Sequence, residues 1–429
     1  MEKNNPKVLR AWTFYDWANS VYSLSITTAI FPIYYNSITT ANGSDQVTFL
    51  GRTFTNTALY SYALSFSFLV IAFLSPLLSG IADYKGNKKF FMRLFCFLGS
   101  AACASLYFFK DLPQLDMGIF SFILASIGWA GSIVFYNAFL PEIATADMQD
   151  KVSARGFALG YIGSSLLLIF NLAMILYPSW FGITNSGMAS RISFLMTGLW
   201  WFGFALLTFK YLPEKTSTHK SNNQLLTKGF NELITVLKQL QSLPMLKRFL
   251  ISFFFYNMGV QTVMYVASLF GTKELHMRDD ELITTVLIIQ FVAIAGAYLF
   301  SFLSSKVGNI KALLIGVTIW IGICWAAYFV TTSLQFFALA FAVGMIMGGI
   351  QALSRSTYSK MLPVTQDNAS YFSFYDICDK IGLVLGTVAY GFIEELTGSM
   401  RNSILVLMIF FVVGLFSLLS IRNFKTQST

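Results

Sequence analysis

The chain is built from long apolar runs separated by short polar segments. A helix needs roughly 20 mainly apolar residues to cross the core of a bilayer, and twelve runs of about that length follow one another. Lipid offers no hydrogen-bond partner to the backbone, and the runs lack the alternation of barrel strands, so each run is predicted to be a helix. The predicted spans are 13–38, 57–82, 90–109, 116–140, 156–178, 189–212, 246–271, 281–303, 311–331, 334–354, 373–396 and 402–421.

The composition excludes a water-soluble globule. Hydrophobic residues make up 55% of the 429 residues and charged residues only 11%, whereas soluble domains carry roughly 25% charged residues. The first apolar run is too long for a signal peptide and shows no cleavage-site pattern, so we expect it to be retained. The predicted fold class is an all-α polytopic membrane protein with twelve transmembrane helices.

Lysine and arginine are distributed unevenly between the predicted loops. Short cytoplasmic loops carry an excess of these residues, and with the N-terminus inside, the cytoplasmic segments hold most of the 29 in this chain. The opposite loops hold Arg52, Lys110, Arg191, Lys273, Arg278 and Arg401, and Lys380 lies within a span. Both termini are therefore predicted to be cytoplasmic. Topology and attraction to the lipid bilayer explain the formal net charge of +9, so no nucleic-acid partner is expected.

Two short sequences recur at one fixed offset. GNKK at 86–89 returns as GNIK at 308–311, and YNAFLP at 136–141 returns as YSKMLP at 358–363, in both cases 222 residues further along. Two matches in one register indicate an internal repeat.

The repeat predicts two six-helix halves, residues 1–212 and 246–429, joined by a cytoplasmic linker at 213–245. Apolar residues recur in the linker at helical spacing, at Leu226, Phe230, Leu233, Leu237 and Leu240. Such a segment is typical of an amphipathic helix at the membrane surface, acting either as a tether that lets the halves rock or as a spacer. Two parallel six-helix halves are the architecture of a large class of secondary transporters, which bind substrate between the halves.

The segment FYDWANS places an ionisable residue, Asp16, at the start of the first apolar run. The other charged residues well inside the predicted spans are Asp376, Asp379 and Lys380, and intramembrane charges are functional hypotheses by default because they are costly. One hypothesis is that Asp16 pairs across the halves with Lys380 or with Arg355 when the cytoplasmic side is closed. The alternative is that Asp16 reaches the membrane surface while Asp376 and Lys380 satisfy each other on one helix face.

The loop between the second and third spans, GIADYKGNKK, resembles the loop signature of the major facilitator superfamily. Gly86 permits a tight turn, and Lys88 and Lys89 are expected to hold the loop in the cytoplasm. Asp83 can accept hydrogen bonds from a helix N-terminus in the other half, which would favour the state closed to the cytoplasm. An ordinary basic inside loop is the alternative. The second copy has Ser305 at the position of the acid, so only one half is predicted to make this latch.

Several segments together resemble the vacuole-effluxer-like family of the major facilitator superfamily. They are FYDWANS, YNAFLPEIA, SARGFALGYIGS, YNMGVQT and GGIQALSRSTYSKMLP, spread over both halves. The resemblance implies the major facilitator fold and, for a bacterial member, a plasma (inner) membrane location. The fungal members export amino acids from the vacuole, and the bacterial members mostly lack a known substrate. Where the family usually has an acid after YN in the seventh span, this chain has Met258, which puts a role of that acid in doubt here.

Amide side chains are predicted to face the space between the halves. An amide accepts and donates hydrogen bonds at once, which suits a polar or zwitterionic small molecule, although amides also bond neighbouring helices. The predicted substrate-binding residues are Asn19, Asn137, Asn257, Gln261 and Gln351, with Asn171 and Gln290 in a wider set. The glycines Gly156, Gly160 and Gly163 are expected to serve close helix packing.

These patterns predict a monomeric secondary active transporter that exports a small polar solute, such as an amino acid or another metabolite, by alternating access. A membrane sensor that binds a solute without transport is the alternative. Protons are the candidate coupling ion, taken up by Asp16 or Asp379. The four cysteines and two histidines show no metal or catalytic spacing, so no metal, cofactor or enzymatic activity is expected. Gating and coupling are assigned to Asp16, Asp83, Gly86, Lys88, Lys89, Arg355, Asp379 and Lys380.

Overall fold

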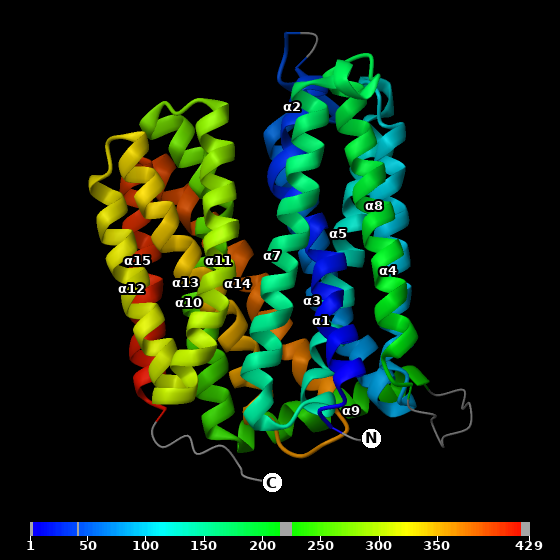
Figure 1. Ribbon diagram of the computed structural model, residues 1–429, viewed down its shortest axis with the longest axis vertical. Coiled ribbons are helices and arrows are strands. Elements are labelled where there is room, and N and C mark those ends of the chain that lie inside the picture. The colour runs from blue at the N-terminus through cyan, green and yellow to red at the C-terminus, as the bar shows by residue number, and fades with distance from the viewer. Residues whose placement is uncertain (1–2, 41–42, 215–224, 422–429) are drawn as a thin grey trace.

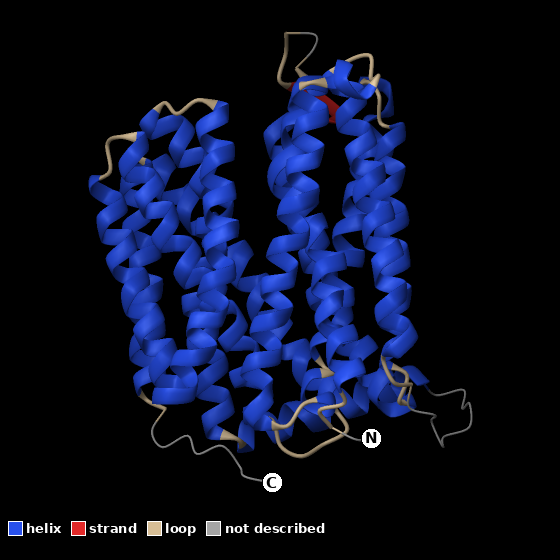
Figure 2. Cartoon of the chain, in the orientation of Figure 1, coloured by secondary structure: helices blue, strands red, loops and turns tan. Residues whose placement is uncertain are grey.

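The computed structural model of the chain describes residues 3–40, 43–214 and 225–421. It is almost entirely helical, as Figures 1 and 2 show. The first part comprises α1 Pro6–Val21, η1 Tyr22–Ile30, α2 Phe31–Thr39, α3 Asn56–Lys85, α4 Lys88–Ser105, η2 Leu106–Phe108, η3 Leu112–Gln114, α5 Leu115–Asn137, α6 Leu140–Ile143, α7 Ala146–Leu176, η4 Pro178–Phe181 and α8 Ser186–Tyr211. The second comprises α9 Leu225–Ser242, α10 Pro244–Leu275, α11 Asp279–Val307, α12 Asn309–Phe329, α13 Ser333–Met361, α14 Asn368–Thr397 and α15 Met400–Leu419.

The predicted all-helical fold is confirmed. Each predicted span overlaps one described helix or the continuous run from α1 to α2, although α7 begins ten residues before its predicted span and α13 ends seven residues after its own. Ten of the described helices are long and apolar enough to cross a membrane on their own. The two remaining spans are the first, which η1 divides, and α14, which carries three charged residues near its middle.

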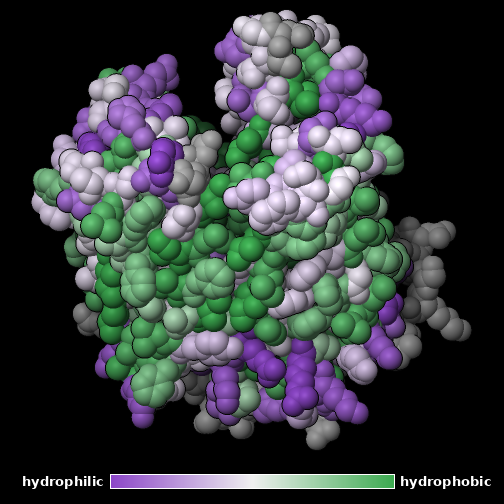
Figure 3. Space-filling view, turned by 45° about the horizontal axis from the view of Figure 1, so that its top comes forward, coloured by the Kyte–Doolittle hydropathy of each residue, from purple (hydrophilic) through white to green (hydrophobic). Residues whose placement is uncertain are grey.

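The helices form two bundles. Helices α1 to α8 pack among themselves, as do α10 to α15, and the bundles meet where α7 contacts α11 and α13 and where α14 contacts α3 and α5. Helix α1 begins and α15 ends at the same end of the molecule, the lower end in Figure 1, which we call the termini side. We call the opposite end the far side. On that side Figure 3 shows the surface hollowed between two lobes.

The surface matches an apolar environment around the middle of the molecule. Large apolar side chains such as Phe73, Val388 and Phe392 are more than half exposed. Figure 3 shows a broad hydrophobic band on this face between hydrophilic ends. Soluble proteins rarely expose contiguous apolar patches of this kind, so the band is the surface that faces lipid.

The first span contains a segment of π-helix that the apolar pattern did not predict. In η1 the hydroxyl of Thr28 donates to the carbonyl of Ser23, five residues earlier, at 2.9 Å. π-Helical turns are rare and occur frequently at functional sites. Ser23, Leu24 and Thr28 of this segment line the cavity described below.

A short hairpin on the far side was also not predicted. Strands β1 Gln46–Phe49 and β2 Arg52–Thr55 pair antiparallel, with Phe49 opposite Arg52. The two turn residues, Leu50 and Gly51, both have positive φ angles, as a two-residue hairpin turn requires. The hairpin joins the first span to α3 and does not contribute to the membrane-spanning bundle.

The linker between the bundles contains the expected helix. Residues 215–224 lie outside the described part, and α9 covers most of the rest. Helix α9 lies across the termini side (Figure 1) and packs mainly against α3, with smaller contacts to α10 and α14. Val236 is fully buried while Phe230 is about half exposed. The helix is therefore amphipathic, and its role as a tether stays a prediction.

Candidate functional site

A cavity of about 210 Å³ lies between the two bundles. All five predicted substrate-binding residues line it, as does Gln290. Asn171 does not: its amide is fully buried elsewhere, with both polar atoms lacking a partner. The wall also carries four charged residues, Asp16, Arg355, Asp379 and Lys380.

Each of the five predicted substrate-binding amides bonds a protein group in this state. Asn257 and Gln261 both donate to the Oδ1 atom of Asp379, at 2.7 Å each. Gln351 accepts from the hydroxyl of Tyr161 at 2.7 Å. These side chains are held in fixed orientations, so a polar solute would meet preoriented groups rather than free rotors.

Two further amides bond on the first half's side of the cavity. Asn19 donates to the hydroxyl of Ser132 at 3.3 Å, and Asn137 accepts from Arg355 at 3.4 Å. Asn137 thus belongs to the group that surrounds Arg355.

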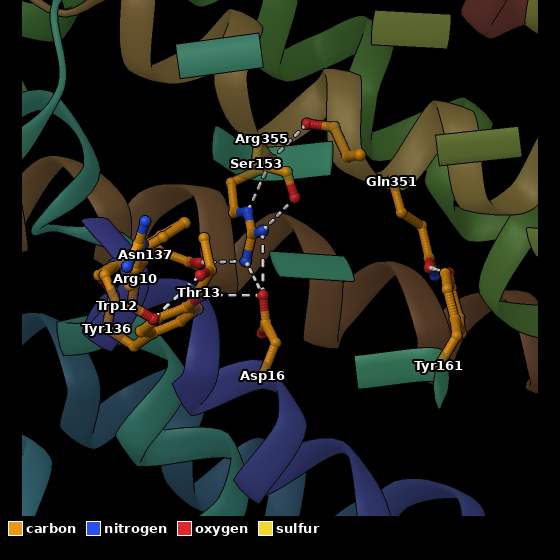
Figure 4. Close-up of polar contacts among 11 residues, drawn as sticks. Arg10, Trp12, Thr13, Asp16, Tyr136, Asn137, Ser153, Tyr161, Gln351 and Arg355 are labelled. Carbon is orange, nitrogen blue, oxygen red and sulfur yellow. Dashed lines mark hydrogen bonds and ion pairs between the residues drawn. The ribbon is translucent and has the colours of Figure 1, made fainter. Parts of the chain in front are cut away.

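Asp16 pairs with Arg355, as Figure 4 shows. The Oδ2 atom of Asp16 lies 3.1 Å from Nη2 and 3.2 Å from Nη1 of Arg355. The hydroxyl of Tyr136 donates to the same oxygen at 2.8 Å. Both charged side chains are nearly buried, so the pair is held by three charge-assisted hydrogen bonds away from water.

The guanidinium of Arg355 has further partners. It donates to the hydroxyl and to the carbonyl of Ser153, at 2.9 Å each. It also stacks near the rings of Phe157, at 4.2 Å, and Trp12, at 4.8 Å, measured to the ring centroids. Ser153 and Phe157 lie on α7, Trp12 on α1 and Asn137 on α5, so Arg355 of α13 joins four helices.

Lys380 is not the partner of Asp16, so that part of the hypothesis is wrong. Its ammonium lies 2.6 Å from Asp379 and 3.6 Å from Asp376. Two aromatic rings, Phe68 of α3 and Trp129 of α5, cover it at 5.5 and 5.1 Å. The alternative hypothesis had Asp376 and Lys380 pair along one helix face while Asp16 reached the membrane surface. The first of these contacts is present, but Asp16 is paired with Arg355.

Close packing of α7 against α1 depends on glycine. A Cβ atom at Gly156 would lie 2.4 Å from Asp16 Oδ2 and 3.0 Å from Arg355 Nη2. One at Gly160 would lie 2.5 Å from the hydroxyl oxygen of Ser20, and one at Gly163 would lie 2.9 Å from the carbonyl oxygen of Trp17. The packing role predicted for these glycines is confirmed.

Asp83 makes the predicted kind of contact with the other half. Its two carboxylate oxygens accept from the backbone N–H groups of Ala369, at 3.2 Å, and Ser370, at 2.7 Å, in the first turn of α14. An anion at a helix N-terminus also interacts favourably with the helix dipole. Gly86 ends α3 with φ +67°, the left-handed turn that suits glycine.

The basic pair that follows is buried rather than solvated. Lys88 forms an ion pair with Glu142, and Lys89 donates to the carbonyl of Leu212 at 2.7 Å. Both lysines are less than a tenth exposed. They therefore join the loop to α6 and to the end of α8 rather than reaching water.

A second contact between the halves was missed in the sequence. Asp150 of α7 accepts from Lys360 at 2.6 Å and from Ser304 and Asn309 at 2.9 Å each. These donors lie beside the second copy of the repeated loop, which lacks an acid of its own. The first half supplies the acid instead. The sequence signal that could have revealed this contact is the second repeated loop itself, which carries hydrogen-bond donors but no acid to accept from them.

The contacts that acids make between the halves on the termini side share one direction. Glu142 also accepts from Asn368 of the second half, at 2.9 Å. The acids come from the first half and the donors from the second. The acids are Asp16, Asp83, Glu142 and Asp150.

The fold defines the class of the protein. The major facilitator superfamily transporter FucP superposes with a TM-score of 0.72 at 14% identity, covering 98% of this chain and 99% of FucP. The human organic anion transporter MFSD10 superposes with a TM-score of 0.74 at 11% identity, covering 97% and 100%. These likenesses show the fold, which is that of the major facilitator superfamily transporters, as predicted.

Sequence comparison narrows the class to one family. Residues 4–428 match the family described as vacuole effluxer Atg22 like, and the protein belongs to it. The uncharacterized MFS-type transporter YxiO of Bacillus subtilis (strain 168) is 33% identical over 416 residues, which cover 97% of this chain and 95% of YxiO. Autophagy-related protein 22 of Kluyveromyces lactis is 24% identical over 460 residues, covering 95% and 92%. The protein is thus an integral multi-pass membrane protein and an MFS-type transporter, and its family is not one of enzymes.

Proposed function

We propose that the protein is a secondary carrier that moves a small polar solute across the membrane by alternating access. The observation that carries this proposal is the cavity between the halves, sealed on the termini side by the buried pair of Asp16 and Arg355. Residues of both halves line the cavity, so a bound solute would contact both and could bias their relative position.

The proposed orientation places the termini side in the cytoplasm. The distribution of lysine and arginine supports this orientation. In the state described here the cavity would then face the outside of the cell. The greater similarity to the bacterial relative than to the yeast one supports a plasma membrane location. The family description supports efflux as the direction, and we take the monomer as the working unit.

The chemistry of the cavity supports a polar solute. Its walls offer fixed amides beside both charge signs, and a solute with separated polar groups could replace the contacts that these amides make with one another. An amino acid or another small metabolite fits this description.

The test has two stages. Purified protein is first screened by thermal shift against amino acids, sugars and nucleosides, because a ligand stabilises the state that binds it. Each solute that raises the unfolding midpoint is then measured for flux in sealed proteoliposomes. Saturable flux that is lost in Asp16→Asn supports a carrier. Saturable binding without flux would identify a sensor and overturn the proposal.

A further inference from the structure

Two carboxylates and one ammonium lie close together on α14, and the two carboxylates differ in how well they are compensated. Asp379 has three partners: Lys380 at 2.6 Å and the amides of Asn257 and Gln261 at 2.7 Å each. Asp376 has one, Lys380, at 3.6 Å, and its Oδ2 atom is buried without a hydrogen-bond partner. The Asp376 residue is only 4% exposed. A buried charge without partners is costly, so Asp376 is the uncompensated group.

Asp376 lies on the face of α14 that is turned toward α3. Asp379 faces α10, because it bonds Asn257 and Gln261 of that helix. Lys380, four residues after Asp376 and on the same helix face, lies against Phe68 of α3. The side chain of Asp376 therefore points into the contact between α3 and α14, which we call the α3–α14 seam.

The facing side of α3 carries unpaired hydroxyl groups. Phe68 and Asp83 of α3 both contact α14. Ser75 lies seven residues after Phe68, Ser79 four residues after Ser75, and Asp83 four residues after Ser79. These spacings place all four residues on one face of the helix. Both serines are buried, and both hydroxyl oxygens lack a hydrogen-bond partner. The helices run antiparallel, and at a rise of about 1.5 Å per residue Ser75 lies within roughly one turn of the level of Asp376.

A backbone oxygen is available at the same level. Pro76 lies inside α3 and has no N–H group, so the carbonyl of Ala72, four residues earlier, receives no helical hydrogen bond. Carboxylate, hydroxyl and carbonyl oxygens are the ligands that hard cations prefer. The seam therefore offers oxygen ligands, with Lys380 as the cation beside Asp376.

We propose that the carboxylate of Asp376 takes up one monovalent cation, a proton or a sodium ion, in the α3–α14 seam, and that this is the coupling ion of the carrier. The inference rests on the proposed transport function and replaces Asp16 and Asp379 as the coupling group, because each of those already has a close cationic partner. The charged groups nearest Asp376 are Asp379 and Lys380 on its own helix. The neighbouring faces of α3, α5 and α10 present Phe68, Trp129, Asn257, Gln261 and Tyr265.

Position explains how the cation would couple to transport. Asp376 belongs to the second half and Ser75 to the first, and Asp83 holds the two helices together nearer the termini side. A cation in the seam would bind oxygens of both halves and stabilise the state closed on the termini side. Opening of that side would separate the oxygens and release the cation.

The test uses the purified full-length protein and the two cations alone, without solute. Infrared spectra at neutral pH report the C=O stretch of a protonated carboxyl group. Thermal unfolding is measured in sodium chloride against potassium chloride at equal ionic strength. We expect one of two results for the wild type: a protonated-carboxyl band, or a saturating rise of the midpoint with sodium. Either signal should be absent in Asp376→Asn and retained in Asp116→Asn, which removes an exposed carboxylate from α5.

A second variant separates the two cations. Ser75→Ala leaves the carboxyl band unchanged if the cation is a proton, and lowers the apparent sodium affinity about tenfold if it is sodium, because one oxygen ligand is lost. Absence of both signals in the wild type, or persistence of the signal in Asp376→Asn, would overturn the proposal. Both readouts work without a transported solute, so a failure to find flux would count against the carrier function and not against this cation site.

Discussion

The buried charge of Arg355 is compensated by partners from several helices. Its guanidinium bonds Asp16 of α1 and Ser153 of α7 and lies over the rings of Phe157 and Trp12. Arginine suits this position because its planar group can accept stacking on its faces while its edges donate hydrogen bonds. Separation of α13 from α1 and α7 would remove these partners at once, which makes the residue a sensitive point of the closed state.

We expect Asp16→Asn to destabilise the protein by about 3 kcal/mol, because breaking a buried ion pair leaves an uncompensated charge. The measurement is the thermal unfolding midpoint of the purified variant. Asp16→Asn/Arg355→Met should recover most of the loss, since removing both charges leaves neither unpaired. A double variant as unstable as the single one would contradict the assignment of the pair.

We expect Gly156→Ala to act on the same pair without changing any charge. The added methyl group would lie 2.4 Å from Asp16 Oδ2, so the carboxylate or α7 must move. A lower midpoint, with a loss of about 1 to 3 kcal/mol typical of overpacking, is the expected result. Gly203→Ala in α8 is the matched control, since nothing lies within 4 Å of its added atom. Equal unfolding midpoints for the two variants would show that α7 can move away from Asp16 without loss of stability.

At the scale of residues, the sequence predicted which side chains line the cavity better than it predicted which side chains bond each other. All five amides assigned to the cavity lie on its wall, because polar side chains inside apolar runs have few other places to go. The partner of Asp16 could not be chosen between Lys380 and Arg355, because helical rise gives the depth of a residue and not its rotation about the helix axis. Asp150 was missed because it precedes its apolar run and looked like an ordinary loop residue.

At the scale of elements, α3 and α14 bring polar groups of the two halves together along one contact. Asp83 accepts from the start of α14, Ser79 and Ser75 follow along the seam, and Lys380 lies at its inner end against Phe68. Small residues allow the two helices to approach closely, as is common between helices in membranes. The contact at Asp83 joins the two helices at the termini-side end of the seam.

We expect Asp83→Asn to loosen the seam, because a neutral amide accepts the two N–H groups of α14 less well and loses the favourable charge at the helix N-terminus. The weakening should be about 1 kcal/mol, or roughly fivefold in the population of the open state. The measurement is the alkylation rate of Ser79→Cys in a background without the four native cysteines. Asp147→Asn, which removes an exposed acid from the first turn of α7, is the control. An unchanged rate in Asp83→Asn would show that the latch does not hold the seam.

The positions of the helices followed from the apolar runs alone, because only a helix satisfies the backbone in lipid at that length. Two local features did not follow. The π-helical turns of η1 depend on hydroxyl groups that bond within the helix, and a serine or threonine in an apolar run has several other uses. The hairpin at Gln46–Thr55 lies in a loop, where a turn with two positive φ angles, one of them at Leu50, has little sequence signal.

At the scale of the whole molecule, the two halves are closed against each other on the termini side and hollowed apart on the far side (Figure 3). The four acids of the first half contribute to the closure, and the cavity lies between the halves, bounded by Asp16 and Arg355 on its wall. A carrier in this state binds its solute from one side only.

We expect a cysteine on the cavity wall to be labelled from the far side and not from the termini side. Thr28→Cys lies on η1 and lines the cavity, whereas Ser79→Cys lies in the closed seam. In intact cells, with the termini inside, a membrane-impermeant thiol reagent should modify the first and spare the second. Labelling of Thr28→Cys only in inverted membrane vesicles would show that the orientation or the open side has been assigned the wrong way round.

The common direction of the ion pairs between the halves has a consequence for assembly. The two halves share an internal repeat, and a half that presented both acids and donors could bind a copy of itself. In the ion pairs between the halves each surface presents one sign of charge only: two first halves would bring carboxylate against carboxylate, and two second halves would bring Arg355 and Lys360 against their own copies. Self-association along this surface is thus disfavoured, and each half recognises the other alone, even though both carry the same repeated sequence.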